Sequence, residues 1–345
     1  MQGDKKMSYH DYPIPPRENY LRLMKNEDPQ YLCDEHTYTN GFFFDPILLS
    51  APQRIEGEIT KDSWGVSWKW LKGHIAANPY ITDETKVIKD ITQWEKYVEV
   101  PWPSEVTEGW QEAKARADAF DRENQLLMCC CFGGLFEMSH YLMGFEDALM
   151  NYLLEPEAMT ELLTVIADYK IEYMKMLIDN LNPDMVHFHD DWGNKRSLFM
   201  SPETWRKMLK PHYERIYGYI KSRGVLIQHH ADCVCAPIVE DMVDLGIDVW
   251  QGIIPQNNIE EVQKIVNGRM ALQGGIDGTV FDFAEWNEAD VRKEVRRACD
   301  DYVPAGYFIP CIPNGVPLTP GINDVVLDEI NTYGRDFFKR LKEKK

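Results

Sequence analysis

The sequence has no long apolar run and no leader-like beginning. None of its apolar stretches approaches the roughly 18 residues that a membrane-spanning helix needs. The opening MQGDKKMSYHDYPIPP carries basic residues, but the apolar segment of a secretory signal does not follow them. We therefore expect neither a membrane span nor a signal peptide, and we predict a cytoplasmic protein.

Positive charge is also in short supply. The chain has 37 Lys and Arg residues against 56 Asp and Glu residues, for a formal net charge of -19. A protein of this charge repels the phosphates of nucleic acids and the head groups of an anionic membrane. The expected partners are small molecules or other proteins, with no nucleic acid and no membrane among them.

Cysteines are few and linkers are absent. Eight cysteines in 345 residues, in a reducing compartment, suit burial, reactivity or metal binding better than disulfide pairing. We find no internal repeat and no Ser/Gly-rich linker, so we expect a single domain over residues 1–345. Residues 1–100 are rich in Trp, Tyr, Pro and Gly with little helical periodicity, which indicates an elaboration of long aromatic loops.

From about residue 104 onward, apolar strands alternate with amphipathic helices. Six strands are expected, at 125–132, 184–190, 224–230, 247–253, 269–276 and 307–312. Helices are expected at 157–181 and from the N-cap Ser201 to Gly224. This alternation predicts parallel βα units. A further pair of strands near 31–36 and 96–100 would bring the count to eight, which favours an α/β fold of the TIM (β/α)8 barrel type over a doubly wound sheet.

In a βα barrel the reacting groups lie where strands end and loops begin. Polar and thiol side chains are therefore candidates where they follow a predicted strand. They are Glu137, His140, His187, His189, Asp190, Asp191, His229, His230, Asp232, Gln256, Asp277 and Cys311.

Side chains alternate along a strand, so His187 and His189 share one face of their strand. If that face points inward, two imidazoles line the cavity; otherwise they are hydrogen-bonded core histidines. Asp190 and Asp191 are candidates for the same site, or for a turn or a helix cap. Trp192, which follows them, favours a substrate-binding loop.

Four segments together carry a family resemblance. They are GFEDALMNYLLEPEAM, HDDWGNKRSLFMSPETWRKMLKPHYERI, LIQHHADCVCAPIVEDMVDLGIDVWQ and ALQGGIDG. With RENYLRLMKNEDPQYL as an opening helix, the chain resembles the uroporphyrinogen decarboxylase superfamily over most of its length. It is most similar to the branch of methyltransferases that serve corrinoid proteins. The resemblance implies a TIM barrel with its active site at the carboxyl ends of the strands.

The sequence departs from the family in two places. The arginine-containing N-terminal motif with which the decarboxylases bind porphyrinogen carboxylates is absent, and GFFFDP and DSWGVSW occupy that region. Decarboxylation of a tetrapyrrole is therefore disfavoured. Members of the branch that form methylthiols bind zinc through a His-x-Cys pair and a distant Cys, whereas this chain has His230 and Asp232 at the pair and Cys311 as the distant residue.

The resemblance thus implies a zinc site formed by His230, Asp232 and Cys311. These three are competent zinc ligands, and a set of three leaves one position open for a substrate. The alternative is a metal-free hydrogen-bonded pair in which Asp232 orients His230 as a general acid. Because one thiolate is replaced by a carboxylate, the harder site suits polarisation of an oxygen better than activation of a thiol.

The resulting hypothesis is a methyltransferase that moves a methyl group from a methylated small molecule to a corrinoid protein. The donor is expected to be a methoxylated aromatic, whose ether oxygen the metal polarises. His187, His189, Asp190, Asp191 or Glu137 would position the ring or protonate the leaving phenolate. The expected substrate-binding residues are Phe42, Phe44, Trp64, Trp192, His140 and Gln256.

Corrinoid is expected on a separate protein, because this chain has no DxHxxG motif to hold it. We expect that protein to dock over residues 191–200 and 312–320. Three alternatives stay open: transfer from a methyl-corrinoid to a thiol or a pterin, decarboxylation of the uroporphyrinogen type, and a non-catalytic binding barrel. The oligomeric state is also open.

Overall fold

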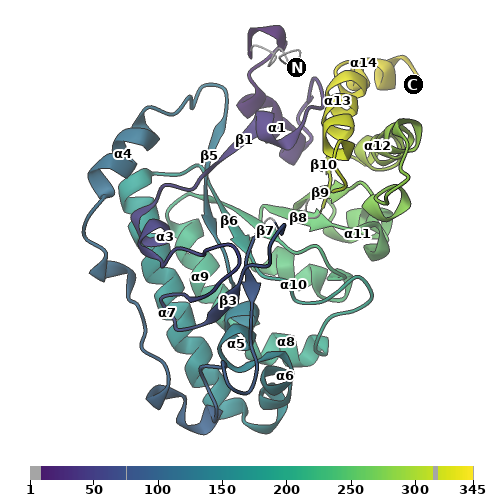
Figure 1. Cartoon of the computed structure of the whole chain (residues 1–345). Helices are drawn as coiled ribbons and strands as arrows, with labels where there is room; N and C mark the ends of the chain where they lie inside the picture. The colour runs from purple at the N-terminus through teal and green to yellow at the C-terminus, as the bar shows by residue number, and fades with distance from the viewer. Residues whose placement is uncertain (1–8, 75, 314–317, 345) are drawn as a thin grey trace.

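The structure, a computed structural model, describes residues 9–74, 76–313 and 318–344. Its centre is a parallel seven-stranded sheet in the order β1-β5-β6-β7-β8-β9-β10 (Figure 1). The seven strands are β1 (Thr39–Phe42), β5 (Leu126–Cys131), β6 (Met185–His189), β7 (Leu226–His230), β8 (Val249–Ile253), β9 (Ala271–Gly275) and β10 (Phe308–Cys311). Consecutive strands are neighbours from β5 to β10, with helices between them, so the predicted α/β, TIM-barrel-like fold is confirmed.

All six strands predicted beyond residue 104 are present. Each is shorter than its apolar run, because the flanking residues turn into loops. Strands β8 and β9 are buried at every position, as expected for strands covered on both faces.

The predicted N-terminal pair of strands is wrong. Residues 31–34 have no regular structure, although Tyr31, Leu32 and Cys33 are buried. The backbone N–H of Leu32 donates to the carbonyl of Gly334, so this apolar run is paired with the C-terminal helices instead of a strand. Residue 96 ends a 3-10 helix, η2 (Ile91–Lys96), and 97–100 are irregular.

The first strand of the sheet is instead β1, which pairs in parallel with β5. The described residues therefore contain seven parallel strands, where eight were expected. Helix α1 packs against β9 and β10, and α2 packs against β1. The N-terminal segment thus lies between the two edge strands (Figure 1).

Helices cover the outside of the sheet (Figure 1). They are α1 (Pro16–Lys25), α2 (Glu35–Tyr38), α3 (Pro46–Ser50), α4 (Trp110–Asp118), α5 (Leu135–Met143), α6 (Phe145–Leu154), α7 (Pro156–Leu181), α8 (Pro202–Met208), α9 (Lys210–Ser222), α10 (Val239–Asp244), α11 (Ile259–Val266), α12 (Glu288–Tyr302), α13 (Ile322–Gly334) and α14 (Phe337–Glu343). Helix α7 matches the prediction closely. The helix expected from Ser201 to Gly224 is two helices, because Pro211 starts a new first turn just after Leu209.

The region before α4 contains few regular elements, as its composition predicts. A small antiparallel sheet is formed by β2 (Ile59–Lys61), β3 (Ser67–Lys69) and β4 (Asn78–Pro79). Among the described residues, no helix is both long and apolar enough to cross a membrane. Of the segment 312–320, where a partner was expected to dock, residues 314–317 lie outside the described residues.

Candidate functional site

Three side chains converge at the carboxyl ends of β6 and β7. His189 and His230 are register partners in the two strands, and their rings stack with centroids 4.5 Å apart and planes 15° from parallel. Asp191 follows β6. One ligand atom from each of His189, Asp191 and His230 lies within 4.8 Å of the other two, so the group is able to hold a metal ion.

Each imidazole of this group is held by a second residue. Nδ1 of His189 lies 3.0 Å from Oε2 of Glu137, and Nδ1 of His230 is hydrogen-bonded to Oε1 of Gln251. Nε2 of each ring has no hydrogen-bond partner in the described part of the chain. A carboxylate or carbonyl on one ring nitrogen is the usual way in which proteins orient the other nitrogen toward a metal.

Burial and nearby charges shift the pKa values of His189, Asp191 and His230. Burial works against a charged His189, but the hydrogen bond to Glu137 and the charges of Glu137, Asp191 and Asp190 outweigh it and raise its pKa to about 9. Burial raises the pKa of Asp191 to about 7, although the charge of His189 opposes the shift. Burial, followed by charge on His189, holds the pKa of His230 well below its ordinary value. In the metal-free protein His189 therefore carries the proton at neutral pH, and His230 does not.

His187 lies one layer deeper on the same face of β6, as the alternation predicts. Its Nδ1 is 2.7 Å from Oε1 of Gln228, and burial lowers its pKa to about 4. The side-chain amide of Gln228 donates to the hydroxyl of Tyr20 and to Oε1 of Gln273. The amide of Gln273 donates in turn to Glu35 at 2.8 Å. His187 is thus the end of a buried polar chain inside the barrel, and it is uncharged.

The predicted zinc ligands are not the group that the structure brings together. His230 is shared by both sets, but Gln251 lies between it and Cys311, with its Nε2 3.9 Å from the thiol sulfur. Asp232 meets the site through its backbone N–H, which donates to Oδ1 of Asp191 at 3.0 Å. Within the described residues, His189, Asp191 and His230 form the one group of three or more such ligands.

Asp190 is a capping residue rather than a cavity residue. It is fully buried, and its carboxylate accepts the backbone N–H groups of Phe136 at 3.0 Å and Glu137 at 2.9 Å, in the first turn of α5. It also accepts from the indole of Trp192 and the hydroxyl of Tyr213. All four of these hydrogen-bond partners are donors, so Asp190 holds α5, and with it Glu137, against the end of β6.

His229 points away from the barrel interior, as strand alternation predicts. Its Nδ1 lies 2.6 Å from the hydroxyl of Tyr217 on α9, and its ring stacks on Trp192 with centroids 4.0 Å apart. Trp192 is 1% exposed and packs against Trp205 as well. Trp192 is therefore part of the layer between sheet and helices, and its expected contact with substrate stays a prediction.

A cavity of about 700 Å³ opens beside His189 and Glu137. Its wall comes mainly from the N-terminal loops, α3, α5 and α7, and includes the rings of Trp64, Trp68, Trp102, Phe132, Tyr141, Tyr169 and Tyr173. A planar aromatic ligand would find matching surfaces here, since offset and edge-to-face ring contacts are favourable. Trp64 and Glu137 were both predicted as site residues, and both line this cavity.

The other predicted substrate residues lie outside the cavity wall. Phe42 is buried edge-on against Phe44, and Phe44 lies under the guanidinium of Arg116. His140 packs among Phe136, Tyr141 and Phe145, and burial lowers its pKa to about 4. Gln256 is exposed in the 3-10 helix η5 (Pro255–Asn257).

Several wall residues were not predicted. Phe132 is 49% exposed, although it follows a strand that is otherwise buried. Its ring lies 6.2 Å from that of His189 and 6.4 Å from that of Phe43. The sequence did offer a signal for Phe132, namely an aromatic residue at the end of a predicted strand, where site residues are expected. Lys170 in the wall, and Gln251 beside His230, gave none, because each lies inside an element whose pattern indicates packing alone.

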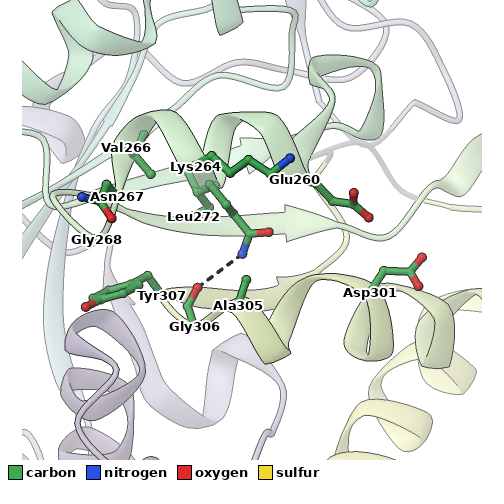
Figure 2. Close-up of a pocket in the computed structure, with 11 residues that line it drawn as sticks. Glu260, Lys264, Val266, Asn267, Gly268, Leu272, Asp301, Ala305, Gly306 and Tyr307 are labelled. Atoms are coloured by element: carbon green, nitrogen blue, oxygen red, sulfur yellow. Dashed lines mark hydrogen bonds between the residues drawn. The ribbon is translucent and has the colours of Figure 1, made fainter.

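A second cavity, of about 400 Å³, lies far from this chemistry. Figure 2 shows it between α11 and the segment Ala305–Tyr307, with Leu272 at the start of β9 in its wall. Gln263 crosses it and donates to the carbonyls of Tyr302 and Gly306. This cavity is at the amino ends of the strands, a face that serves stability in barrels of this kind.

Comparison with solved structures shows the same fold elsewhere. The "methyltransferase from Methanosarcina mazei" aligns with a TM-score of 0.58 at 14% identity, covering 94% of this chain and 99% of that one. At this identity the likeness concerns the fold.

Sequence comparison gives curated relatives and a family. Proteins named uroporphyrinogen decarboxylase from Bacillus thuringiensis (strain Al Hakam) and Bacillus cereus (strain AH187) are 27% identical over 190 residues, which is 54% of this chain and 49% of theirs. The chain thus spans about half the length of the curated relatives that it matches. The family model described as Uroporphyrinogen decarboxylase (URO-D) matches residues 65–317, more than half of the sequence. The chain belongs to the uroporphyrinogen decarboxylase family.

Proposed function

We propose that the protein is a methyltransferase that removes the methyl group of a methoxylated aromatic compound and passes it to a corrinoid protein. The observation that carries the proposal is that His189, which forms a group with Asp191 and His230, lines an aromatic cavity of about 700 Å³. Cleavage of a methyl ether needs an electrophile at the ether oxygen and a flat surface for the ring, and the two are adjacent here. The fold shared with a Methanosarcina methyltransferase supports the same class of reaction.

The donor set fits a metal ion. Two imidazoles and one carboxylate, with each imidazole oriented by a second residue, are typical of a zinc site with an open position. We infer zinc, held by His189, Asp191 and His230. When bound, it would supply a Lewis acid to the ether oxygen.

The chain's own residues orient the reactants. Glu137 holds Nδ1 of His189, and Gln251 holds Nδ1 of His230, so both rings are fixed before substrate enters. Phe132 faces His189, and the rings of Trp64, Trp68 and Tyr141 complete the wall against which the substrate ring would lie. Fixed groups reduce the reorganisation needed in the transition state.

A general-acid mechanism is the second candidate for the same reaction. It was first framed around His230, but a pKa well below the ordinary value leaves that ring without a proton at neutral pH. His189 is the better acid, because its pKa of about 9 keeps it protonated beside Glu137. In that case His189 would deliver its Nε2 proton to the leaving phenolate.

Decarboxylation remains the alternative that the names of the curated relatives favour. A porphyrinogen with several carboxylates needs several cations. The cavity wall contains three, Arg54, Lys170 and the protonated His189, and His189 is already paired with Glu137. This count favours a smaller substrate.

The corrinoid partner is proposed on the resemblance and on the shared fold. The partner would approach over 191–200, the segment that carries Asp191, since the cobalt must reach the mouth of the cavity. Transfer from methyl-corrinoid to a thiol or a pterin would use the same face in reverse.

The test is a methyl-transfer assay. Purified protein with zinc, a corrinoid protein in the Co(I) state and a panel of methoxylated aromatics should convert the cobalt absorption to that of methyl-cobalt. Absence of conversion with every donor, from protein that binds zinc, would contradict the proposal. Release of CO₂ from uroporphyrinogen, or demethylation of methyl-corrinoid by thiols or pterins, would identify the alternatives.

A further inference from the structure

Lys170 is a buried cation in the wall of the aromatic cavity. It lies on α7, is 3% exposed, and donates from Nζ to the carbonyl of Phe132 at 3.0 Å. The ammonium also lies over the rings of Tyr169 and Phe188, at 5.7 and 6.0 Å from their centroids. No carboxylate among the described residues forms an ion pair with it.

The acids near the cavity are already occupied. Asp62 accepts the indole N–H of Trp68 at 2.8 Å and two backbone N–H groups. Glu137 is paired with His189, and Asp45 accepts from Tyr173 and from the backbone N–H of Leu48.

Two other groups of the surroundings do not balance the charge of Lys170. Burial raises the pKa of the Cys131 thiol above its ordinary value, even though Lys170 lowers it, so the thiol next to the ammonium is neutral. Glu105, the remaining acid of the wall, is exposed to solvent.

A buried ammonium in this situation is costly. Lysine has three N–H donors, and Lys170 uses two of them on neutral protein acceptors, the carbonyl of Phe132 and the thiol of Cys131. Lysines are almost never fully buried without a partner, because removing the charge from water is compensated only by an anion or a set of acceptors. The third donor belongs to a residue that lines the cavity, so the missing anionic acceptor belongs to whatever the cavity binds.

We propose that Lys170 binds a carboxylate of the substrate, and that the substrate is a methoxylated aromatic acid. This inference rests on the proposed function and narrows it to an anionic donor. Phe132 lies near both Lys170 and the proposed metal ligands. Its carbonyl accepts from Lys170, and its ring lies 6.2 Å from the ring of His189. Arg54, which is exposed and stacks on Trp68 at 3.5 Å, is a second cation at the same cavity.

The test compares an acid with its neutral isostere by binding alone. Titration with 3-methoxybenzoate and 3-methoxybenzamide, followed by calorimetry, should show that the wild type prefers the acid by roughly tenfold or more, as expected for a charge-assisted hydrogen bond in a desolvated site. Lys170→Met should lose most of this preference, because the remaining cation, Arg54, is exposed to solvent. Lys175→Met, which removes an exposed lysine of the same helix, should keep the wild-type preference.

Three outcomes would overturn the inference. They are an equal affinity of the wild type for both ligands, an unchanged preference in Lys170→Met, and loss of the preference in Lys175→Met as well. If Lys170→Met does not fold, Lys170→Arg keeps the charge and should keep the preference, and a loss there would equally count against the role of charge.

Failure of this inference is distinguishable from failure of the proposed function. Selective binding of the acid without any change at cobalt would contradict methyl transfer and leave the role of Lys170 intact. Methyl transfer from neutral donors alone, with no preference for acids, would do the reverse.

Discussion

His229 and His230 are neighbours in the chain, yet they serve different layers of the molecule. His230 faces the barrel interior beside His189, while His229 is buried among Trp192 and Tyr217. Strand alternation alone predicts this division. The sequence therefore identifies which histidines can share a site, and the same rule places His187 and His189 together on β6.

Alternation does not extend to the loop residues, and there the predicted ligand set departs from the structure. Asp232 lies two residues beyond His230, so an extended segment would place both on one face, but β7 ends at His230. The chain then turns, and Asp191 reaches the histidines instead, fixed by the backbone N–H of Asp232. Which of two loop carboxylates enters a site depends on the path of the loop, and a sequence pattern contains no information on it.

The ligand set gives a prediction at the residue scale. Asp191→Asn should lower zinc affinity by at least roughly a hundredfold, because a ligand contributes more than the outer residues whose loss costs roughly 10–100-fold. His189→Ala and His230→Ala should do the same. Equilibrium dialysis with a zinc chelator as competitor measures the effect.

Asp232→Asn and Cys311→Ser are the matched controls. Both residues are close to the site without belonging to the His189, Asp191 and His230 group, so their zinc affinity should stay within a few-fold of the wild type. If Asp232→Asn and Cys311→Ser lose zinc while Asp191→Asn retains it, the set first inferred from the sequence is correct and the one drawn from the structure is not.

Helix α5 is the element on which the geometry of the site depends. It carries Glu137, the partner of His189, and its first turn is fixed by the buried carboxylate of Asp190. The start of α5 can lie this close to Asp190 because residue 134 is glycine and has no side chain. A Cβ there would lie 2.2 Å from Cβ of Asp190. Gly134 has an ordinary negative φ of -68°, so space, rather than backbone conformation, requires glycine at this position.

This contact gives a prediction at the scale of the element. Gly134→Ala should destabilise the protein by about 1–3 kcal/mol, the usual cost of overpacking, and should also weaken zinc binding because α5 and Glu137 move. Gly218→Ala is the control: Gly218 is exposed within α9 and nothing lies near its added Cβ, so alanine should stabilise by about 0.5–1 kcal/mol. Urea unfolding measures both changes, and equal effects of the two substitutions would contradict the role given to Gly134.

Elements with a clear period were predictable, and those without one were not. Strands β5 to β10 are runs of apolar residues between turn signals, and each was located to within a few residues. Strand β1 reads TNGF, which has neither length nor alternation, and it is a strand because β5 offers it a partner. Buried Tyr31 and Leu32 mimic a strand in the sequence, although their partners are helices.

At the scale of the whole molecule, the seven-stranded sheet needs its N-terminal helix. Helix α1 packs against β9 and β10, and it sends Tyr20 into the barrel, where the hydroxyl donates to Oε1 of Gln273 at 2.9 Å and accepts from Gln228 at 3.2 Å. Gln228 in turn holds His187, one layer below the proposed metal site. The opening helix is thus connected through three side chains to the interior of the site.

This connection gives the last prediction. Tyr20→Phe keeps the ring and removes the hydroxyl, which leaves buried amide groups of Gln273 and Gln228 short of a partner, so we expect a loss of about 1–3 kcal/mol in the free energy of unfolding. Tyr20→Ala should lose about 3–5 kcal/mol, because a cavity is added to the lost hydrogen bonds. Zinc affinity should be unchanged in Tyr20→Phe, since neither His189 nor His230 contacts the altered group. Urea unfolding and zinc titration on the same samples test both expectations. A Tyr20→Phe protein as stable as the wild type would mean that the hydroxyl does not join α1 to the sheet. A loss of zinc affinity without a loss of stability would place Tyr20 in the site instead of beneath it.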